Sequence, residues 1–220
     1  MNTLKTDHMT SADWQLSKTD VFWGEIAPCD HVVQIYEDNN VFMDMLAGYV
    51  GGGINAGDCV IVIATKAHLD GLNDRLKDHG VHIEGLIAGD HFIPLDAEET
   101  LSKFMVNGWP DEDLFMQVVS KLIARARKNN RKVRAFGEMV AILWAQGLSG
   151  ATVQLDYLWN KFCEQETLCL FCAYPKSGFT QDMNTSIMHI CGSHSKIICG
   201  TDKPLTEIMY KTTEVQKQAV

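Results

Sequence analysis

The sequence predicts an α/β fold with a mainly parallel central β-sheet and helices on both faces. Short apolar runs rich in β-branched residues alternate with segments of helical periodicity along the whole chain. The run "CVIVIAT" (59–65) is continuously apolar, as is typical of a strand buried on both faces of a parallel sheet. The 220 residues are 46% hydrophobic and 21% charged, which is enough for one substantial core.

The first half of the chain predicts three strand–helix units. Glycines or capping residues mark the expected helix ends: Gly51 and Gly80 end two helices, and Asp96 with Glu99 begins a third. In order, we expect a strand at 31–36, a helix from Asp38 with Phe42, Met45, Leu46 and Tyr49 on one side, a strand at 59–65, a helix with Leu69, Leu72 and Leu76, a strand in "HFIPLDA" (91–97), and a helix with Leu101, Phe104 and Met105.

The second half continues the alternation. The expected elements are a long helix from Asp111, a strand at "KVRAFG" (132–137), a helix at "ATVQLDYLWNKF" (151–162), a strand at "TLCLFCAYP" (167–175), a helix near 183–190, and a strand at "KIICG" (196–200). We expect a polar arm at 1–27, one domain at 28–200 and a tail at 201–220. Leu205, Ile208 and Met209 would share one side of a tail helix, which is either packed on its own domain or offered to a partner.

The stretch "GGGINAGDCVIVIAT" (51–65) resembles a nucleotide-binding motif only superficially. Gly52 and Gly57 have Walker spacing, but Asp58 and Cys59 occupy the positions of the lysine and the serine or threonine. The glycines also precede their strand instead of following it, and the chain after Ala64 reads "TKAHLDGL". We interpret the glycines as a tight entry into the strand.

The net charge of −9 disfavours nucleic acid and anionic membranes as general partners. No apolar run is long enough for a signal peptide or a membrane span, so we expect a cytoplasmic protein. Seven cysteines fit reduced thiols. Cys169 and Cys172 would point to opposite faces of a strand, so we expect core packing there and no metal site.

In an open α/β sheet, ligands bind beyond the carboxyl ends of the strands. Glu138 is the leading candidate among the residues at these ends, because it lies between two apolar stretches and needs a partner. Arg134, four residues earlier, could supply the charge, either in a ligand site or in a buried structural ion pair. The candidate ligand-binding residues at strand ends are Tyr36, Glu37, Thr65, Lys66, Glu138, Met139 and Tyr174, with Asp96 beside them.

Two histidines lie just before or at the start of expected strands. His31 begins the first strand and His194 precedes the last, and each is either a ligand contact or a satisfied structural histidine. His189 and His194 are five residues apart, which does not suit a metal pair on a helix. No serine or cysteine triad stands out, and no G-x-S-x-G elbow is present, so we expect no catalytic residues.

Several segments together closely resemble the MEDS domain, the methanogen/methylotroph DcmR sensory domain, over about residues 28–200. They are "HVVQIYED", "YVGGGINAGDCVIVIAT", "FMVNGWPDEDLF", "VRAFGEMVAILWAQG", "LDYLWNKF", "LCLFCAYP" and "ICGSHSKII". The resemblance implies a relative of RecA/KaiC-type ATPases whose phosphate loop has decayed. It also implies a sensor of small organic molecules, such as hydrocarbon derivatives, of a kind found beside histidine kinases or DNA-binding regions. Asp156 stands where many members have glutamate.

The sequence therefore predicts a non-catalytic sensory domain that binds a small organic molecule and needs no cofactor. Its output would pass to a signalling partner, such as a histidine kinase or transcription regulator, or to a second copy in a homodimer. Two alternatives remain open: a nucleotide-binding KaiC-like ATPase, and a protein-interaction module with a vestigial pocket.

Overall fold

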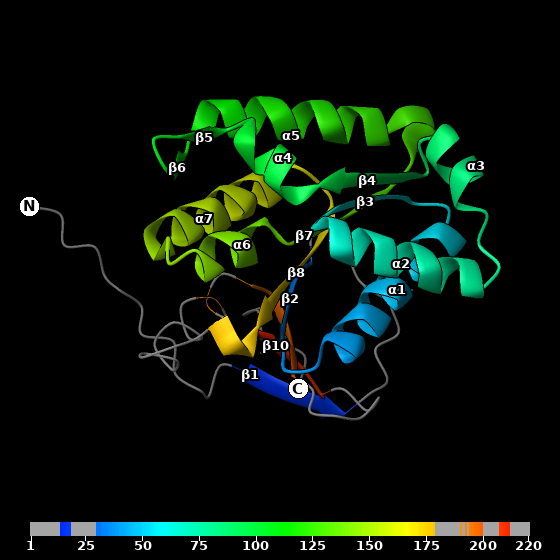
Figure 1. The fold of residues 1–220 in the computed structure, drawn as a ribbon, viewed down its shortest axis with the longest axis horizontal. Coiled ribbons are helices and arrows are strands. Elements are labelled where there is room, and N and C mark those ends of the chain that lie inside the picture. The colour runs from blue at the N-terminus through cyan, green and yellow to red at the C-terminus, as the bar shows by residue number, and fades with distance from the viewer. Residues whose placement is uncertain are drawn as a thin grey trace, which may run out of the picture.

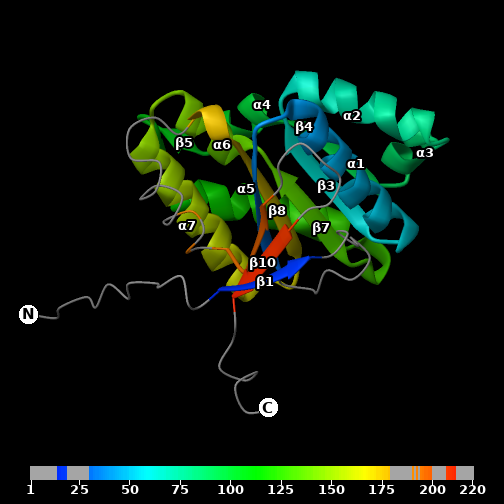
Figure 2. The ribbon, with the colours of Figure 1, turned by 90° about the horizontal axis from the view of Figure 1, so that it is seen from below.

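The computed structural model describes residues 14–18, 30–178, 190, 192, 194–199 and 207–211. Figure 1 shows a central sheet between two helical layers, and Figure 2 shows the same layers from below. The helices α1 (Asn39–Asn55), α2 (Lys66–Asp78) and α3 (Ile83–Ala88) cover one face. The other face is covered by α4 (Ala97–Ser102), α5 (Glu112–Ala126), α6 (Met139–Ala145) and α7 (Ser149–Gln165).

Eight strands of the described chain form the main sheet, in the order β1-β10-β9-β2-β8-β7-β3-β4. The six strands from β9 to β4 are parallel, while β10 and β1 add antiparallel pairs at one edge. The strands are β1 (Trp14–Lys18), β2 (His31–Tyr36), β3 (Cys59–Ala64), β4 (Phe92–Asp96), β7 (Val133–Gly137), β8 (Cys169–Pro175), β9 (Lys196–Cys199) and β10 (Glu207–Lys211). A separate hairpin is made by β5 (Met105–Val106) and β6 (Trp109–Pro110), and short 3₁₀ turns are η3 (Lys128–Asn130) and η4 (Lys176–Gly178).

The α/β prediction with a mainly parallel sheet is confirmed. Each residue of β3 is buried, as its uninterrupted apolar run indicated. The N-cap expected at Asp96 forms, since its side chain accepts a backbone N–H in the first turn of α4. Asp38 and Asp111, from which helices were expected, cap α1 and α5 in the same way. The helix expected near 183–190 lies outside the described residues except for Ile190.

The interpretation of the triple glycine as a strand entry is wrong. Gly51, Gly52 and Gly53 lie inside α1, which continues to Asn55. A Cβ on Gly53 would lie 2.6 Å from Val60 Cγ2 and 2.9 Å from Arg134 Cδ, so this glycine lets α1 pack closely on β3 and β7. The turn into β3 is made by Gly57, whose φ of +77° favours glycine.

Both chain ends contribute strands, and the helix expected in the tail is wrong where the structure describes it. Ile208 and Met209 lie in β10, which pairs antiparallel with β9 on one side and β1 on the other. β1 lies in the region expected to be a polar arm. Leu205 is outside the described residues. The tail therefore extends the sheet, because β9 would otherwise present unpaired backbone groups at its edge.

The pairing expected between Arg134 and Glu138 is also wrong. β7 ends at Gly137, and Glu138 turns away as the N-cap residue of α6. Arg134, near the start of β7, donates from Nε to Asp58 Oδ2 at 2.7 Å, and both side chains are buried. The Arg134 guanidinium also lies 5.8 Å from the ring centre of Tyr49. The buried charge is thus balanced at the amino end of the strand.

We expect Asp58→Asn to lower the free energy of unfolding by about 3–5 kcal/mol, because it removes the carboxylate from a buried guanidinium. Urea unfolding measures the change. Asp70→Asn is the control, since Asp70 pairs with Lys66 at 3.7 Å on the surface and the change should stay within about 0.5 kcal/mol. Equal effects of the two substitutions would contradict the assignment.

Candidate functional site

The carboxyl edge of the sheet has a topological switch point between β3 and β7. These strands are neighbours, but the chain leaves β3 toward α2 on one face and leaves β7 toward α6 on the other. Ligands in open α/β sheets bind at such points. Thr65 follows β3 and Glu138 follows β7, so two of the predicted site residues meet there.

Glu138 is the centre of a hydrogen-bond network at this switch point. Its buried carboxylate accepts from Thr65 N–H at 2.9 Å and from Thr65 Oγ1 at 3.4 Å. The other oxygen lies 2.7 Å from His68 Nδ1, which therefore donates. His68 Nε2 lies 3.0 Å from Asn39 Oδ1. The network thus joins the first turns of α1, α2 and α6, and we call Asn39, Thr65, His68 and Glu138 the carboxyl-edge network.

An aromatic group adjoins the carboxyl-edge network. The ring of Tyr36, at the end of β2, stacks on Phe42 with centroids 4.5 Å apart, and Phe42 meets His68 edge-on at 5.1 Å. Burial, and secondarily the charge of Glu138, raises the pKa of Tyr36 to about 12. The phenol therefore stays neutral at physiological pH and offers an apolar ring with a polar tip.

A second polar bridge spans the exits of β2 and β8. Glu37 and Lys176 form an ion pair between these neighbouring strands, with both side chains about half exposed. The next residue, Asp38, accepts the N–H groups of Asn40 at 2.6 Å and Val41 at 3.2 Å. The first turn of α1 is therefore occupied by a carboxylate from its own chain.

Three other predicted residues at this edge have different surroundings. Lys66 is exposed and pairs only weakly with Asp70, and Met139 is fully buried in the core. Tyr174 is also fully buried, and its pKa is raised first by burial and then by the charge of the neighbouring Asp156. Met139 and Tyr174 thus pack in the interior beneath the edge.

His31 and His194 lie at the opposite end of the sheet, as does Arg134. His31 and Tyr36 begin and end β2, so their Cα atoms are about 16 Å apart. The structure therefore divides the predicted ligand-binding residues between two edges instead of gathering them in one pocket.

The structure brings His31 and His194 together with Cys172, although the sequence indicated no metal site. One ligating atom from each of the three lies within 4.8 Å of the other two, and all three side chains are buried. Burial lowers the pKa of His194 to about 4 and raises the pKa of the Cys172 thiol well above its ordinary value. We call these residues the His–His–Cys cluster.

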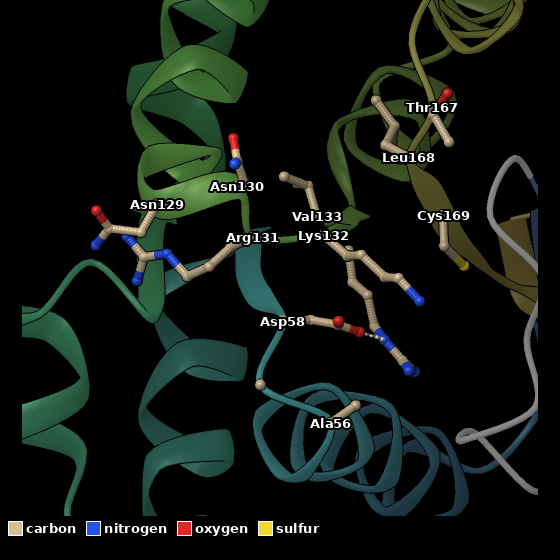
Figure 3. A pocket seen from close by; sticks show the side chains of 12 residues that line it. Ala56, Asp58, Asn129, Asn130, Arg131, Lys132, Val133, Thr167, Leu168 and Cys169 are labelled. Carbon is tan, nitrogen blue, oxygen red and sulfur yellow. Dashed lines mark hydrogen bonds and ion pairs between the residues drawn. The ribbon is translucent and has the colours of Figure 1, made fainter.

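Two hollows open near the amino edge. A cavity of about 680 Å³ adjoins the His–His–Cys cluster and is lined by His31, Asn160 and Cys163 among others. A pocket of about 480 Å³ lies between the end of α1 and the start of β7 (Figure 3). Figure 3 shows the ion pair of Asp58 inside this second pocket, with Arg131 and Lys132 on its wall.

Sequence reasoning missed His68, Asn39 and the joint role of Cys172. His68 had a local signal, because it is the third residue after Thr65 and so lies in the first turn of α2. Asn39 had a similar local signal, because it directly follows the N-cap Asp38 and lies in the first turn of α1. Cys172 had no local signal, since its contact with His31 depends on the register of β8 against β2.

The fold and the switch point define a RecA/KaiC-like α/β domain. Similar solved structures include a protein studied as project PH0250 from Pyrococcus horikoshii OT3, with TM-score 0.56, 12% identity, and coverage of 82% of this chain and 86% of that one. The KaiC-like protein PH0186 from the same organism has a TM-score of 0.56 and 12% identity, and the match covers 85% of this chain and 81% of that one. The flagellar accessory protein FlaH from Methanocaldococcus jannaschii has a TM-score of 0.51 and 10% identity, and the match covers 85% of this chain and 79% of that one.

The chain belongs to the MEDS family, the methanogen/methylotroph DcmR sensory domain, whose model matches residues 30–195. The comparison with curated protein sequences found no match. Within the described residues, no helix is both long and apolar enough to cross a bilayer. The RecA/KaiC-like fold expected from the sequence is confirmed, and the family assigns the chain to sensory domains.

We expect Glu138 and His68 to be coupled energetically. Glu138→Ala should lower the free energy of unfolding by about 1–3 kcal/mol, because it leaves partly buried donors without their acceptor. A double-mutant cycle with His68→Ala should give a coupling above about 0.5 kcal/mol. The matched control is the half-exposed pair Glu37 and Lys176, for which the coupling should be smaller. Additive effects at Glu138 and His68 would refute the network.

Tyr36 gives a pH-dependent prediction. The unfolded chain loses this proton near the ordinary pKa of about 10, whereas the folded chain keeps it up to about 12. The contribution to stability is therefore fully present below pH 10 and is lost as pH rises through 12. The difference between the ultraviolet titrations of the native chain and Tyr36→Phe reports this pKa. Glu138→Gln should lower it, while burial keeps it above 10.

Proposed function

We propose that this chain senses a small neutral or cationic organic molecule at the carboxyl edge of its sheet. The observation that carries the proposal is the network in which Glu138 links the starts of three helices across the switch point. A ligand that donates a hydrogen bond to Glu138 competes with Thr65 or His68 for its oxygens. Binding there therefore alters contacts of α1, α2 and α6 together.

The aromatic group favours an organic ligand with an apolar part. Tyr36 and Phe42 offer stacked rings beside the Glu138 carboxylate. A few orienting polar groups among apolar ones are typical of small-molecule sites. This arrangement agrees with the sensing of hydrocarbon derivatives that the sequence resemblance implies.

The local charges disfavour a nucleotide at the same edge. Phosphate binds where the N–H groups at a helix N-terminus point to a ligand. In α1 these groups are bound by Asp38, and in α2 Thr65 accepts the N–H of His68. Glu37, Asp38 and Glu138 add negative charge. The proposal therefore includes a decayed phosphate site and no nucleotide hydrolysis. The KaiC-like fold makes a nucleotide-binding ATPase the competing candidate.

The output of the domain is proposed to pass by contact to a signalling protein, such as a histidine kinase or a transcription regulator, or to a second copy of the chain. A change at the starts of three helices moves surface elements on both faces of the sheet, since α1 and α2 cover one face and α6 the other. The change is therefore accessible to a partner from either side.

A binding experiment separates these functions. We expect ATP and ADP with magnesium to give no heat in calorimetric titration, while a thermal-shift screen of small alcohols, amines and halogenated hydrocarbons yields ligands. Glu138→Gln should weaken such a ligand at least tenfold, because the carboxylate is its acceptor. Glu37→Gln is the matched control and should keep the affinity, since that side chain belongs to the other bridge.

Micromolar nucleotide binding with turnover would reject the sensory proposal in favour of the ATPase. A ligand whose affinity is unchanged in a folded Glu138→Gln protein would place the sensing site elsewhere. Circular dichroism of each variant verifies the fold.

A further inference from the structure

The His–His–Cys cluster is assembled by three segments that are distant in the sequence. β2 lies between β8 and β9, with His31 opposite Leu170 and Val32 opposite Lys196. Side chains alternate along a strand, so Cys172 lies on the same face as Leu170 and His31. His194 comes just before β9 on the other side of β2. The centroids of the two imidazole rings are 3.9 Å apart.

Hydrogen bonds fix which nitrogen of each ring is available as a ligand. His194 Nδ1 lies 2.6 Å from the Ile190 carbonyl oxygen, and His31 Nδ1 lies 2.6 Å from Asn160 Oδ1. Both partners are acceptors, so each Nδ1 carries the proton. The lone pair of each neutral ring is then on Nε2. Metal-binding histidines are typically oriented in this way by a carbonyl or carboxylate at the second nitrogen.

We propose that His31 Nε2, His194 Nε2 and Cys172 Sγ bind one zinc ion. Zinc bonds of about 2.0–2.1 Å to nitrogen and 2.3 Å to sulfur in tetrahedral geometry place nitrogen and sulfur about 3.6 Å apart. His31 Nε2 lies 3.4 Å from Cys172 Sγ. The third ligand atom lies within 4.8 Å of both, so side-chain rotation of His194 completes the site.

The donor set selects a borderline-soft ion. Two imidazoles and one thiolate suit zinc, whereas calcium and magnesium require oxygen ligands. Binding releases one proton, because the Cys172 thiol becomes a thiolate when its sulfur bonds to the metal. Two neutral imidazoles and one thiolate leave one positive charge, and the nearby Asp156 carboxylate, which acts electrostatically on Cys172, offsets it.

Of the three ligands, His31 lines the adjoining cavity of about 680 Å³, together with Asn160 and Cys163, and all three ligand side chains are buried. Zinc that is held by three protein ligands takes a water or a small molecule in its fourth position. The proposed zinc site lies at the edge of the sheet opposite Glu138, and it does not depend on the proposed organic ligand.

Cobalt(II) is the probe, because a cobalt–thiolate bond gives a charge-transfer absorption that nitrogen and oxygen ligands do not. The full chain, stripped with a chelator, is titrated with cobalt(II) and then with zinc. We expect one equivalent to give the thiolate band and zinc to displace it. Cys172→Ser should abolish the band. Asn160→Ala should weaken binding about 10–100-fold, because it removes the group that orients His31.

Cys169→Ala is the matched control, since this buried cysteine lies on the same strand but faces the other core. It should keep the band and the affinity. No thiolate band in the native chain, or a band that survives in Cys172→Ser, overturns the proposal. If Cys172→Ser loses its circular dichroism spectrum, His31→Gln replaces it, and unchanged affinity in that folded variant overturns the proposal equally.

Discussion

The burial of both faces of the parallel sheet is the constraint on which the rest of this structure depends. β3 and β8 run through the centre with nearly every side chain inaccessible to water, and helices close both sides. Polar side chains cannot be tolerated there without partners. Several buried polar side chains accordingly lie where strands begin and end, with Glu138 at the carboxyl edge and Arg134 and His31 at the amino edge.

The two edges neutralise their buried charge in different ways. Arg134 pairs with the Asp58 carboxylate and lies against the ring of Tyr49, an arrangement that fixes α1 on the sheet. Glu138 instead distributes its hydrogen bonds over Thr65 and His68, which belong to the start of another helix. A ligand can replace one of several hydrogen-bond donors more easily than it can break a buried ion pair. This difference supports placing the proposed sensing site at the carboxyl edge.

The local sequence pattern was sufficient to predict most of the helices and strands but not the contacts between them. The apolar run of β3 and the cap at Asp96 predicted their elements, because burial on both faces and N-capping leave local signals. The role of Gly53 could not be predicted from its neighbours in the sequence. A Cβ is excluded there because Val60 and Arg134, which lie in β3 and β7, pack against it. The spacing of Arg134 and Glu138 suggested a pair only on the assumption that the strand continued. Likewise, the contact of His31 with Cys172 is fixed by strand register, which leaves no sequence signal.

The likeness to KaiC-like proteins is a likeness of fold, and a shared fold can serve different chemistry. The architecture determines only that ligands are met at strand ends and helix starts. The identity of the ligand depends on what already occupies those helix starts, and here Asp38 and Thr65 accept the N–H groups that a phosphate would need. A carboxylate at such a position repels a phosphate and attracts a hydrogen-bond donor. The same geometry that cradles an anion in a phosphate loop therefore agrees in this chain with the neutral or cationic ligand that we propose.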